Sequence, residues 1–227
     1  RGTRKLDIFH DQLDREYFLQ ALFYLDDSHS IPNIFEELRK KYPELLARFL
    51  WPADWDARDP LVLIHAFIAM PNHFHLILEE IREKGISLFM QKFGTGMTGR
   101  YNIRYKTSGN LFEGSYKYAH VKKDDYLQYL GVDVQVKNAF ELYDGGYECA
   151  FRAFDKAFDF ASSYRYGSLS HYLGKHKTPI IDTRAVDSPL FDVGRKSEYK
   201  PFVQSVLRDP DFETGLAGMK LDSPTLG

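Results

Sequence analysis

The clearest pattern in the chain is a pair of apolar segments joined by a short turn. Residues 62–69 (VLIHAFIA) and 74–78 (FHLIL) are rich in residues that favour β-strands. Between them, Pro71 fixes its own φ angle and Asn72 tolerates unusual backbone angles. The pattern predicts a β-hairpin with His73 at the start of its second strand.

Helical spacing dominates the part of the chain before this hairpin. Apolar residues recur at helical intervals over residues 13–25, which predicts an amphipathic helix packed on a sheet. Residues 31–49 predict a further helix or a helix pair, because Pro43 interrupts them. Residues 51–60 are rich in proline and aspartate and predict a connecting loop. We therefore expect a helical insertion at about 28–60, between the helix at residues 13–25 and the hairpin.

The part of the chain after the hairpin alternates between helical and strand patterns. Residues 86–105 have helical spacing but contain three glycines, each costing up to ~1 kcal/mol in a helix interior, so we expect a broken or tightly packed helix. A glycine-rich phosphate loop is the weaker alternative, because no strand directly precedes it in the required pattern. Residues 116–121 predict a strand. Asp124 predicts the start of a helix, where a carboxylate suits the cap and the dipole.

Composition places the chain among folded globular proteins. The 227 residues suffice for a domain with a substantial core, or for a domain and an appendage. Hydrophobic residues make up 44% and charged residues 27%, a balance that excludes a disordered chain. The single cysteine, Cys149, excludes an intramolecular disulfide and favours a reducing compartment. Because no run of about 18 apolar residues occurs, we expect no membrane-spanning segment.

The candidate chemistry starts with His73 and His75. Alternate residues of a strand face the same side, so the two imidazoles can share one divalent metal ion. Neutral imidazole is the commonest protein metal ligand, and two of them on a strand form a pre-organised half-site. Two exposed polar residues are the usual explanation of a bare His-x-His pair. The apolar flanks favour the metal site, which needs at least one further ligand.

The segment at residues 70–77 (MPNHFHLI) resembles the signature of the HUH single-tyrosine transposases, which include the repeat-associated tyrosine transposases of bacteria. Residues 110–117 (NLFEGSYK) resemble the family's approach to its next strand, and residues 124–130 (DDYLQYL) resemble the start of its catalytic helix. Residues 1–11 are similar to the end of its first strand and the approach to its first helix. The resemblance covers most of residues 1–140.

This resemblance implies an α/β (α+β) fold with a central, mainly antiparallel sheet and helices packed on one face, a ferredoxin-like or RRM-like HUH fold. We expect this domain to span residues 1–145, with the helical insertion inside it. Residues 146–227 would form a C-terminal extension that packs on the core and becomes a loose tail from about 215. Family members have a strand just before the Arg-Gly pair, so we expect such a strand to be missing before Arg1.

The resemblance also implies metal-dependent cleavage and strand transfer of single-stranded DNA. A helix tyrosine attacks the scissile phosphate and forms a phosphotyrosine, while Mg²⁺ or Mn²⁺ acts as a Lewis acid and aligns the strand. The implied partners are single-stranded or hairpin DNA and a second copy of the chain in a homodimer, with no membrane partner. The implied location is the bacterial cytoplasm, in association with the nucleoid.

The chain departs from the family pattern on the helix that carries the nucleophile. Asp133 stands where the tyrosine belongs, and Lys137 stands where a further metal ligand lies, with Asn138 next to it. A carboxylate is shorter than a phenol and would form a labile acyl phosphate, although it could bind Mg²⁺ or Mn²⁺ beside the two histidines. Tyr129 lies one helical turn before Asp133 and is the alternative nucleophile.

Basic and aromatic residues interleave after the hairpin, a mixture that suits phosphates and unpaired bases. The candidate DNA-binding residues are Lys92, Arg100, Arg104, Tyr105, Lys106, Lys117, Lys122 and Lys123. A solvated helix face with core tyrosines would have the same composition. Because the net charge is −2, a DNA site must be a local patch.

Three hypotheses follow for the function. The first is a transposase-family DNA-binding protein whose cleavage is impaired by Asp133. The second is a domesticated, non-catalytic module that binds hairpin nucleic acid with the same surface. The third is a metal-dependent hydrolase unrelated to transposition, which would act on phosphodiesters without a covalent intermediate.

Overall fold

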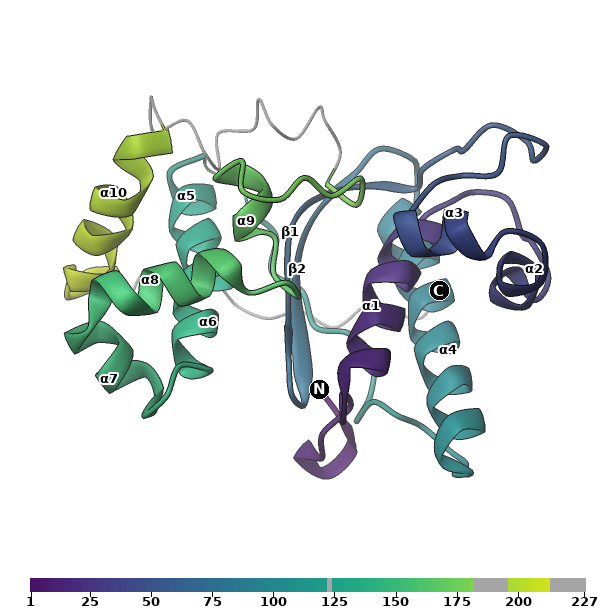
Figure 1. Cartoon of the computed structure of the whole chain (residues 1–227), viewed down its shortest axis with the longest axis horizontal. Coiled ribbons are helices and arrows are strands. Elements are labelled where there is room, and N and C mark those ends of the chain that lie inside the picture. Colours follow the sequence, from purple (N-terminus) through teal and green to yellow (C-terminus); the bar gives the residue numbers. More distant parts are fainter. Residues whose placement is uncertain (122–123, 182–195, 213–227) are drawn as a thin grey trace. The chain divides into compact units, whose positions relative to one another are not determined.

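The computed structural model describes residues 1–121, 124–181 and 196–212 (Figure 1). It divides into two compact units, each of which is described by itself. Unit 1 comprises residues 1–63 and 78–114, and unit 2 comprises residues 64–77 and 115–227. The expected domain boundary near residue 145 stays a prediction. The expected tail from about 215 lies outside the described residues.

The expected hairpin is present. Strand β1 (Val62–Met70) pairs with β2 (His73–Glu80) in a two-stranded sheet. Every residue of β1 is buried, whereas β2 is mostly half-buried. Together with the helices, this sheet confirms the α+β class.

The strand expected at residues 116–121 is wrong. Within this segment, only Tyr118 forms an isolated bridge. Lys117, Tyr118 and His120 are all exposed, so the segment lacks the alternating burial that stabilises a strand on a core.

Unit 1 is built around two of the expected helices. Helix α1 (Gln12–Tyr24) begins after Asp11, whose side chain accepts a hydrogen bond from the backbone N–H of Asp14. Helix α4 (Gly85–Tyr105) runs without a break through its glycines. A short 3₁₀ turn (Thr3–Lys5) precedes α1.

Close packing between α1 and α4 accounts for one of these glycines. A Cβ atom on Gly96 would lie 2.7 Å from Leu25 Cδ1 and 3.4 Å from the Tyr17 hydroxyl, so a larger residue would require these side chains to shift. The Tyr17 hydroxyl donates a hydrogen bond to the Gly96 carbonyl at 3.2 Å. The rings of Phe18 and Phe93 meet edge to face at 5.7 Å between centroids. The expectation of a tightly packed helix is therefore confirmed.

The helical insertion contains α2 (Ile34–Lys41) and α3 (Pro43–Arg48), which confirms the expected helix pair. Tyr24, at the end of α1, holds the segment that follows α3. Its hydroxyl lies 2.8 Å from the Leu45 carbonyl and 3.0 Å from the Leu50 carbonyl, and it donates to this pair of acceptors.

The buried carboxylate of Asp26 fixes the loop at residues 51–60 against the start of β1. One oxygen accepts the backbone N–H groups of Leu61 and Val62 at 3.0 and 3.1 Å. The other accepts from the Arg58 guanidinium at 2.9 Å. Burial raises the pKa of Asp26 to about 6, although Arg58 opposes this shift.

Unit 2 is mainly helical. Its helices are α5 (Asp124–Val132), a π-helical turn labelled η2 (Asp133–Lys137), α6 (Asn138–Glu141), α7 (Gly146–Arg152), α8 (Phe154–Ser163), α9 (Leu169–Tyr172) and α10 (Lys196–Arg208). Helices α6, α7 and α8 pack on one another (Figure 1). Their core contains Ile68 of β1 together with Val134, Phe140, Phe158 and Val203.

The buried strand β1 has a second partner in unit 2. Ile68 forms an antiparallel bridge with Gly167, and the Ser168 backbone N–H donates to the Phe67 carbonyl at 2.9 Å. The turn before α9 therefore supplies hydrogen-bond partners for part of the β1 edge that does not pair with β2. Among the helices of the described ranges, none combines the length and apolar character needed to cross a membrane.

We expect Tyr24→Phe to lower the free energy of unfolding by about 1 kcal/mol, because it removes the hydroxyl that bonds the Leu45 and Leu50 carbonyls. Urea denaturation measures this change. Tyr42→Phe is the matched control, since the Tyr42 hydroxyl bonds Asp54 at the surface, and we expect a loss below about 0.5 kcal/mol. Equal losses in the two variants would contradict the anchoring role of Tyr24.

Candidate metal and nucleic-acid site

The two histidines lie side by side at the start of β2. The ring centroids of His73 and His75 are 5.0 Å apart, and both side chains are half-buried. The Asn72 side-chain oxygen lies 2.6 Å from Nδ1 of His73. Because an amide oxygen accepts, this bond places the proton on Nδ1 and the lone pair on Nε2. Such a bond is how proteins orient a metal-binding imidazole.

Asp133 is the first residue of the π-helical turn, and Lys137 is the last. The Asp133 carboxylate lies 3.7 Å from the Lys137 ammonium, and about a fifth of each side chain is exposed. Throughout the part of the chain that the structure describes, no three His, Cys, Asp or Glu side chains are grouped so that they could hold a metal ion. The structure therefore brings Asp133 to Lys137 and does not bring it to the two histidines.

Tyr129 and Lys137 meet a residue that the sequence did not indicate. The Tyr129 ring lies 6.1 Å from the buried ring of Phe212, and the Lys137 ammonium lies 5.6 Å from the centre of the same ring. Phe212 follows α10, far along the chain from both contacts. No local pattern could have identified it.

Asn138 supports the turn itself. Its side-chain amide donates to the Asp133 carbonyl at 2.7 Å, and its backbone N–H donates to the same oxygen. Asn138 is buried, with 6% of its surface exposed. In this structure its amide therefore serves the helix backbone.

Arg104 and Tyr105, two candidate DNA contacts, bond acidic residues within unit 1. The Arg104 guanidinium pairs with the carboxylates of both Asp11 and Asp14. The Tyr105 hydroxyl donates to Asp14 at 2.7 Å, and its ring meets His10 at 4.9 Å. These contacts join the end of α4 to the start of α1.

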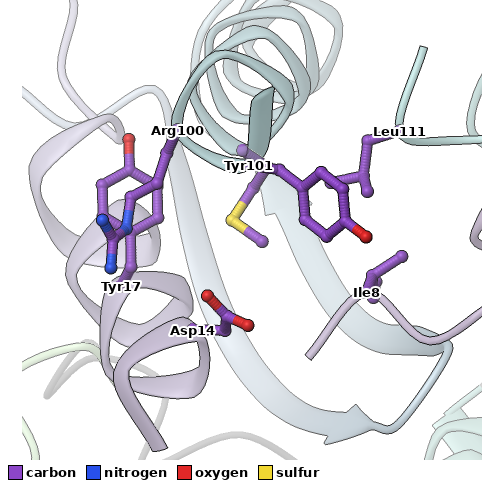
Figure 2. Close-up of a pocket in the computed structure, with 7 residues that line it drawn as sticks. Ile8, Asp14, Tyr17, Arg100, Tyr101 and Leu111 are labelled. Carbon is purple, nitrogen blue, oxygen red and sulfur yellow. The ribbon is translucent and has the colours of Figure 1, made fainter. Parts of the chain in front are cut away.

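Arg100 and Lys92 are also engaged in unit 1. The Arg100 guanidinium lies over the Tyr17 ring (Figure 2), and its central carbon is 4.8 Å from the ring centroid. The Lys92 ammonium donates to the backbone carbonyls of Asp27 and His29. Burial lowers the pKa of Lys92, and the nearby Asp27 carboxylate opposes this shift.

A small cavity lies beside Arg100. It is lined by Ile8, Asp14, Tyr17, Met97, Arg100, Tyr101 and Leu111 (Figure 2). Its volume is about 10 Å³, which is room for roughly one water molecule. The cavity is therefore too small to hold an unpaired nucleobase.

Two of the remaining candidate DNA contacts are exposed. Lys106 follows α4 with a left-handed φ of 53°, and Lys117 lies in the segment after unit 1. Lys122 and Lys123 lie outside the described residues.

Gln135, in the middle of the π-helical turn, was not identified from the sequence. Only 1% of its surface is exposed. Its amide nitrogen donates to the Ser168 hydroxyl at 2.9 Å, and its amide oxygen accepts from the Tyr199 hydroxyl at 3.3 Å. A polar residue between two valines was the available signal, because the valines indicate a buried segment.

Comparisons of the chain with protein-family models, with curated proteins and with solved structures gave no match. The likeness of residues 70–77 to a transposase signature therefore stays a resemblance. The interpretation of the site rests on the geometry of its own residues.

The pairing of Asp11 with Arg104 predicts a pH dependence. A hydrogen bond from Arg104 lowers the pKa of the Asp11 carboxyl from 3.8 to about 2. A carboxyl with a lower pKa in the folded state stabilises the fold above its ordinary pKa, and this contribution is lost as the pH falls through the folded value. We expect Asp11→Asn, which keeps a side-chain cap, to flatten the acid decline of stability between pH 3.8 and 2.

Urea denaturation at several pH values measures this slope. Arg104→Gln removes the donor and should flatten the same part of the curve. An acid decline in Asp11→Asn as steep as in the parent protein would contradict the pairing.

Proposed function

We propose that the chain is a DNA-binding protein of the HUH single-tyrosine transposase type, which holds Mg²⁺ or Mn²⁺ with His73 and His75 at a phosphodiester of single-stranded or hairpin DNA. The observation that carries this proposal is the histidine pair on β2, with rings 5.0 Å apart and His73 oriented by Asn72. Two imidazoles leave most positions of an octahedral ion for water and phosphate oxygens.

The chemistry of the donor set fits this use. A bound Mg²⁺ or Mn²⁺ would supply Lewis acidity at a nonbridging phosphate oxygen. The two histidines hold their side of the site rigid, because they belong to a paired strand next to the fully buried β1. We further propose that this hairpin belongs to a mainly antiparallel sheet of the ferredoxin-like HUH type.

Cleavage is the weaker half of the proposal. In an active member, a phenol oxygen forms a bond to phosphorus, the bond to the 3′ oxygen breaks, and the 3′-hydroxyl leaves. Asp133 stands at that position here, and its carboxylate is paired with Lys137 at 3.7 Å. We therefore propose a protein that binds DNA and cleaves it poorly. Tyr129 remains the alternative nucleophile, and its ring contact with Phe212 favours a packing role.

A non-catalytic module that binds hairpin nucleic acid is the second candidate. The ion pair between Asp133 and Lys137 favours it, because neither residue supplies a nucleophile suited to a stable phosphoryl intermediate. In both candidates the chain acts on DNA as a homodimer in the bacterial cytoplasm, at the nucleoid.

Metal binding can be tested without DNA. We expect His73→Ala and His75→Ala each to weaken Mn²⁺ binding by more than about tenfold, as measured by electron paramagnetic resonance of free Mn²⁺. Asn72→Ala should weaken it less, because it removes only the orienting bond. His120→Ala, at an exposed histidine that is not part of the hairpin, should bind as the parent does. An unchanged affinity in both histidine variants would remove the metal site from the proposal.

Restoring a phenol tests the proposed reaction. We expect Asp133→Tyr, incubated with labelled single-stranded hairpin DNA and Mn²⁺, to form a protein–DNA adduct that survives denaturation. Asp133→Phe is the matched control, because it has the same ring without the hydroxyl, and it should form none. If Asp133→Tyr binds Mn²⁺ and DNA but forms no adduct, the nucleophile assignment is wrong. Salt-sensitive hairpin binding that also survives His73→Ala and His75→Ala would favour the non-catalytic module.

A further inference from the structure

The π-helical turn is buried at its centre and exposed at both of its ends. Val134, Gln135 and Val136 are all buried, with at most 2% of each exposed, whereas Asp133 and Lys137 on either side reach solvent. The wide turn is closed by the backbone N–H of Asn138, which donates to the carbonyl of Asp133, five residues earlier. Such turns occur frequently at functional sites.

Gln135 ties this turn to strand β1. Its amide nitrogen donates to the Ser168 hydroxyl oxygen at 2.9 Å, and the same oxygen accepts the backbone N–H of Phe67 in β1 at 3.1 Å. The Tyr199 hydroxyl bonds the amide oxygen from the other side. Both ends of the amide are therefore satisfied, which a polar group at this depth requires.

An amide is an unusual choice for this position if packing alone mattered. The neighbouring valines are equally buried and need no hydrogen bond. A buried amide with one donor contact and one acceptor contact fits its partners in a single orientation, so it specifies a register that an apolar side chain would leave open. In this protein, the buried amide would specify how the π-helical turn is rotated about the helix axis.

We propose that Gln135 is a positioning residue, which ties the wide turn to β1 through Ser168 and thereby sets the direction of the side chains at positions 133 and 137. This role rests on the proposed function, since position 133 is where the nucleophile of an active relative would stand. Without the amide, the turn can relax toward a regular helix, which rotates residue 133 relative to residue 137 by about 100°.

The first experiment reads the direction of residue 133 without DNA or metal. Asp133→Cys introduces a thiol at this position, and the native, exposed Cys149 serves as the internal reference. The ratio of the two alkylation rates with iodoacetamide is measured by peptide mass spectrometry. We expect Gln135→Met, which keeps the volume and removes the hydrogen bonds, to change this ratio severalfold.

Ser168 supplies the matched controls. Ser168→Ala removes the hydroxyl that receives the amide, and it should change the ratio as Gln135→Met does. Ser168→Thr keeps the hydroxyl and should restore the parent ratio. A purely structural role would lower the urea stability of these variants and leave the ratio of the folded protein unchanged, which would overturn the proposal. If Gln135→Met does not fold, the two Ser168 variants decide the question.

The second experiment measures the consequence for the proposed reaction. In the Asp133→Tyr background with Mn²⁺ and hairpin DNA, we expect Gln135→Met to lower the adduct yield at least about tenfold while DNA affinity stays the same. Gln135→Met and Ser168→Ala together should cost no more than either alone, because both break the same link. An unchanged yield would overturn the positioning role. If Asp133→Tyr alone forms no adduct, the proposed function fails, and the alkylation ratio still decides the role of Gln135.

Discussion

The burial of β1 is the constraint on which the candidate site depends. All nine of its residues are buried, so the backbone groups on both of its edges need partners away from water. Strand β2 supplies one edge, and the turn at residues 166–168 contributes bonds to the other. The first pairing fixes the alternation that puts His73 and His75 on one side. The second brings Ser168 to the point where Gln135 can reach it.

Local order was predictable from the sequence because it depends on near neighbours. The hairpin, α1, the helix pair of the insertion and α4 all follow from apolar spacing, proline and turn residues. The strand expected at residues 116–121 was wrong, because its residues have strand-forming types but no core beneath them. The glycines of α4 left two outcomes open, and only the position of α1 decided between them. The sequence pattern does not show which distant segments pack against each other.

The roles of the basic and aromatic residues also could not be predicted from the sequence pattern. Composition cannot distinguish an arginine that faces DNA from one that faces an aspartate. In unit 1, Arg104 meets two carboxylates and Lys92 meets two carbonyls, so their charge is already used within the protein. The acidic partners of Arg104 lie about 90 residues earlier in the sequence, which hides the pairing from any local pattern.

The proposed metal half-site depends on residues that are close together in the sequence, whereas the position of residue 133 depends on residues that are far apart. This difference explains why the proposal of metal binding has more support than the proposal of cleavage. The histidines are oriented by their own strand and by Asn72, the residue before His73. The direction of residue 133 depends on Gln135, Ser168 and Phe67, which come from three separate parts of unit 2. A metal half-site can therefore persist in a chain that has lost its nucleophile. Restored cleavage would need both the phenol and the register that the buried amide specifies.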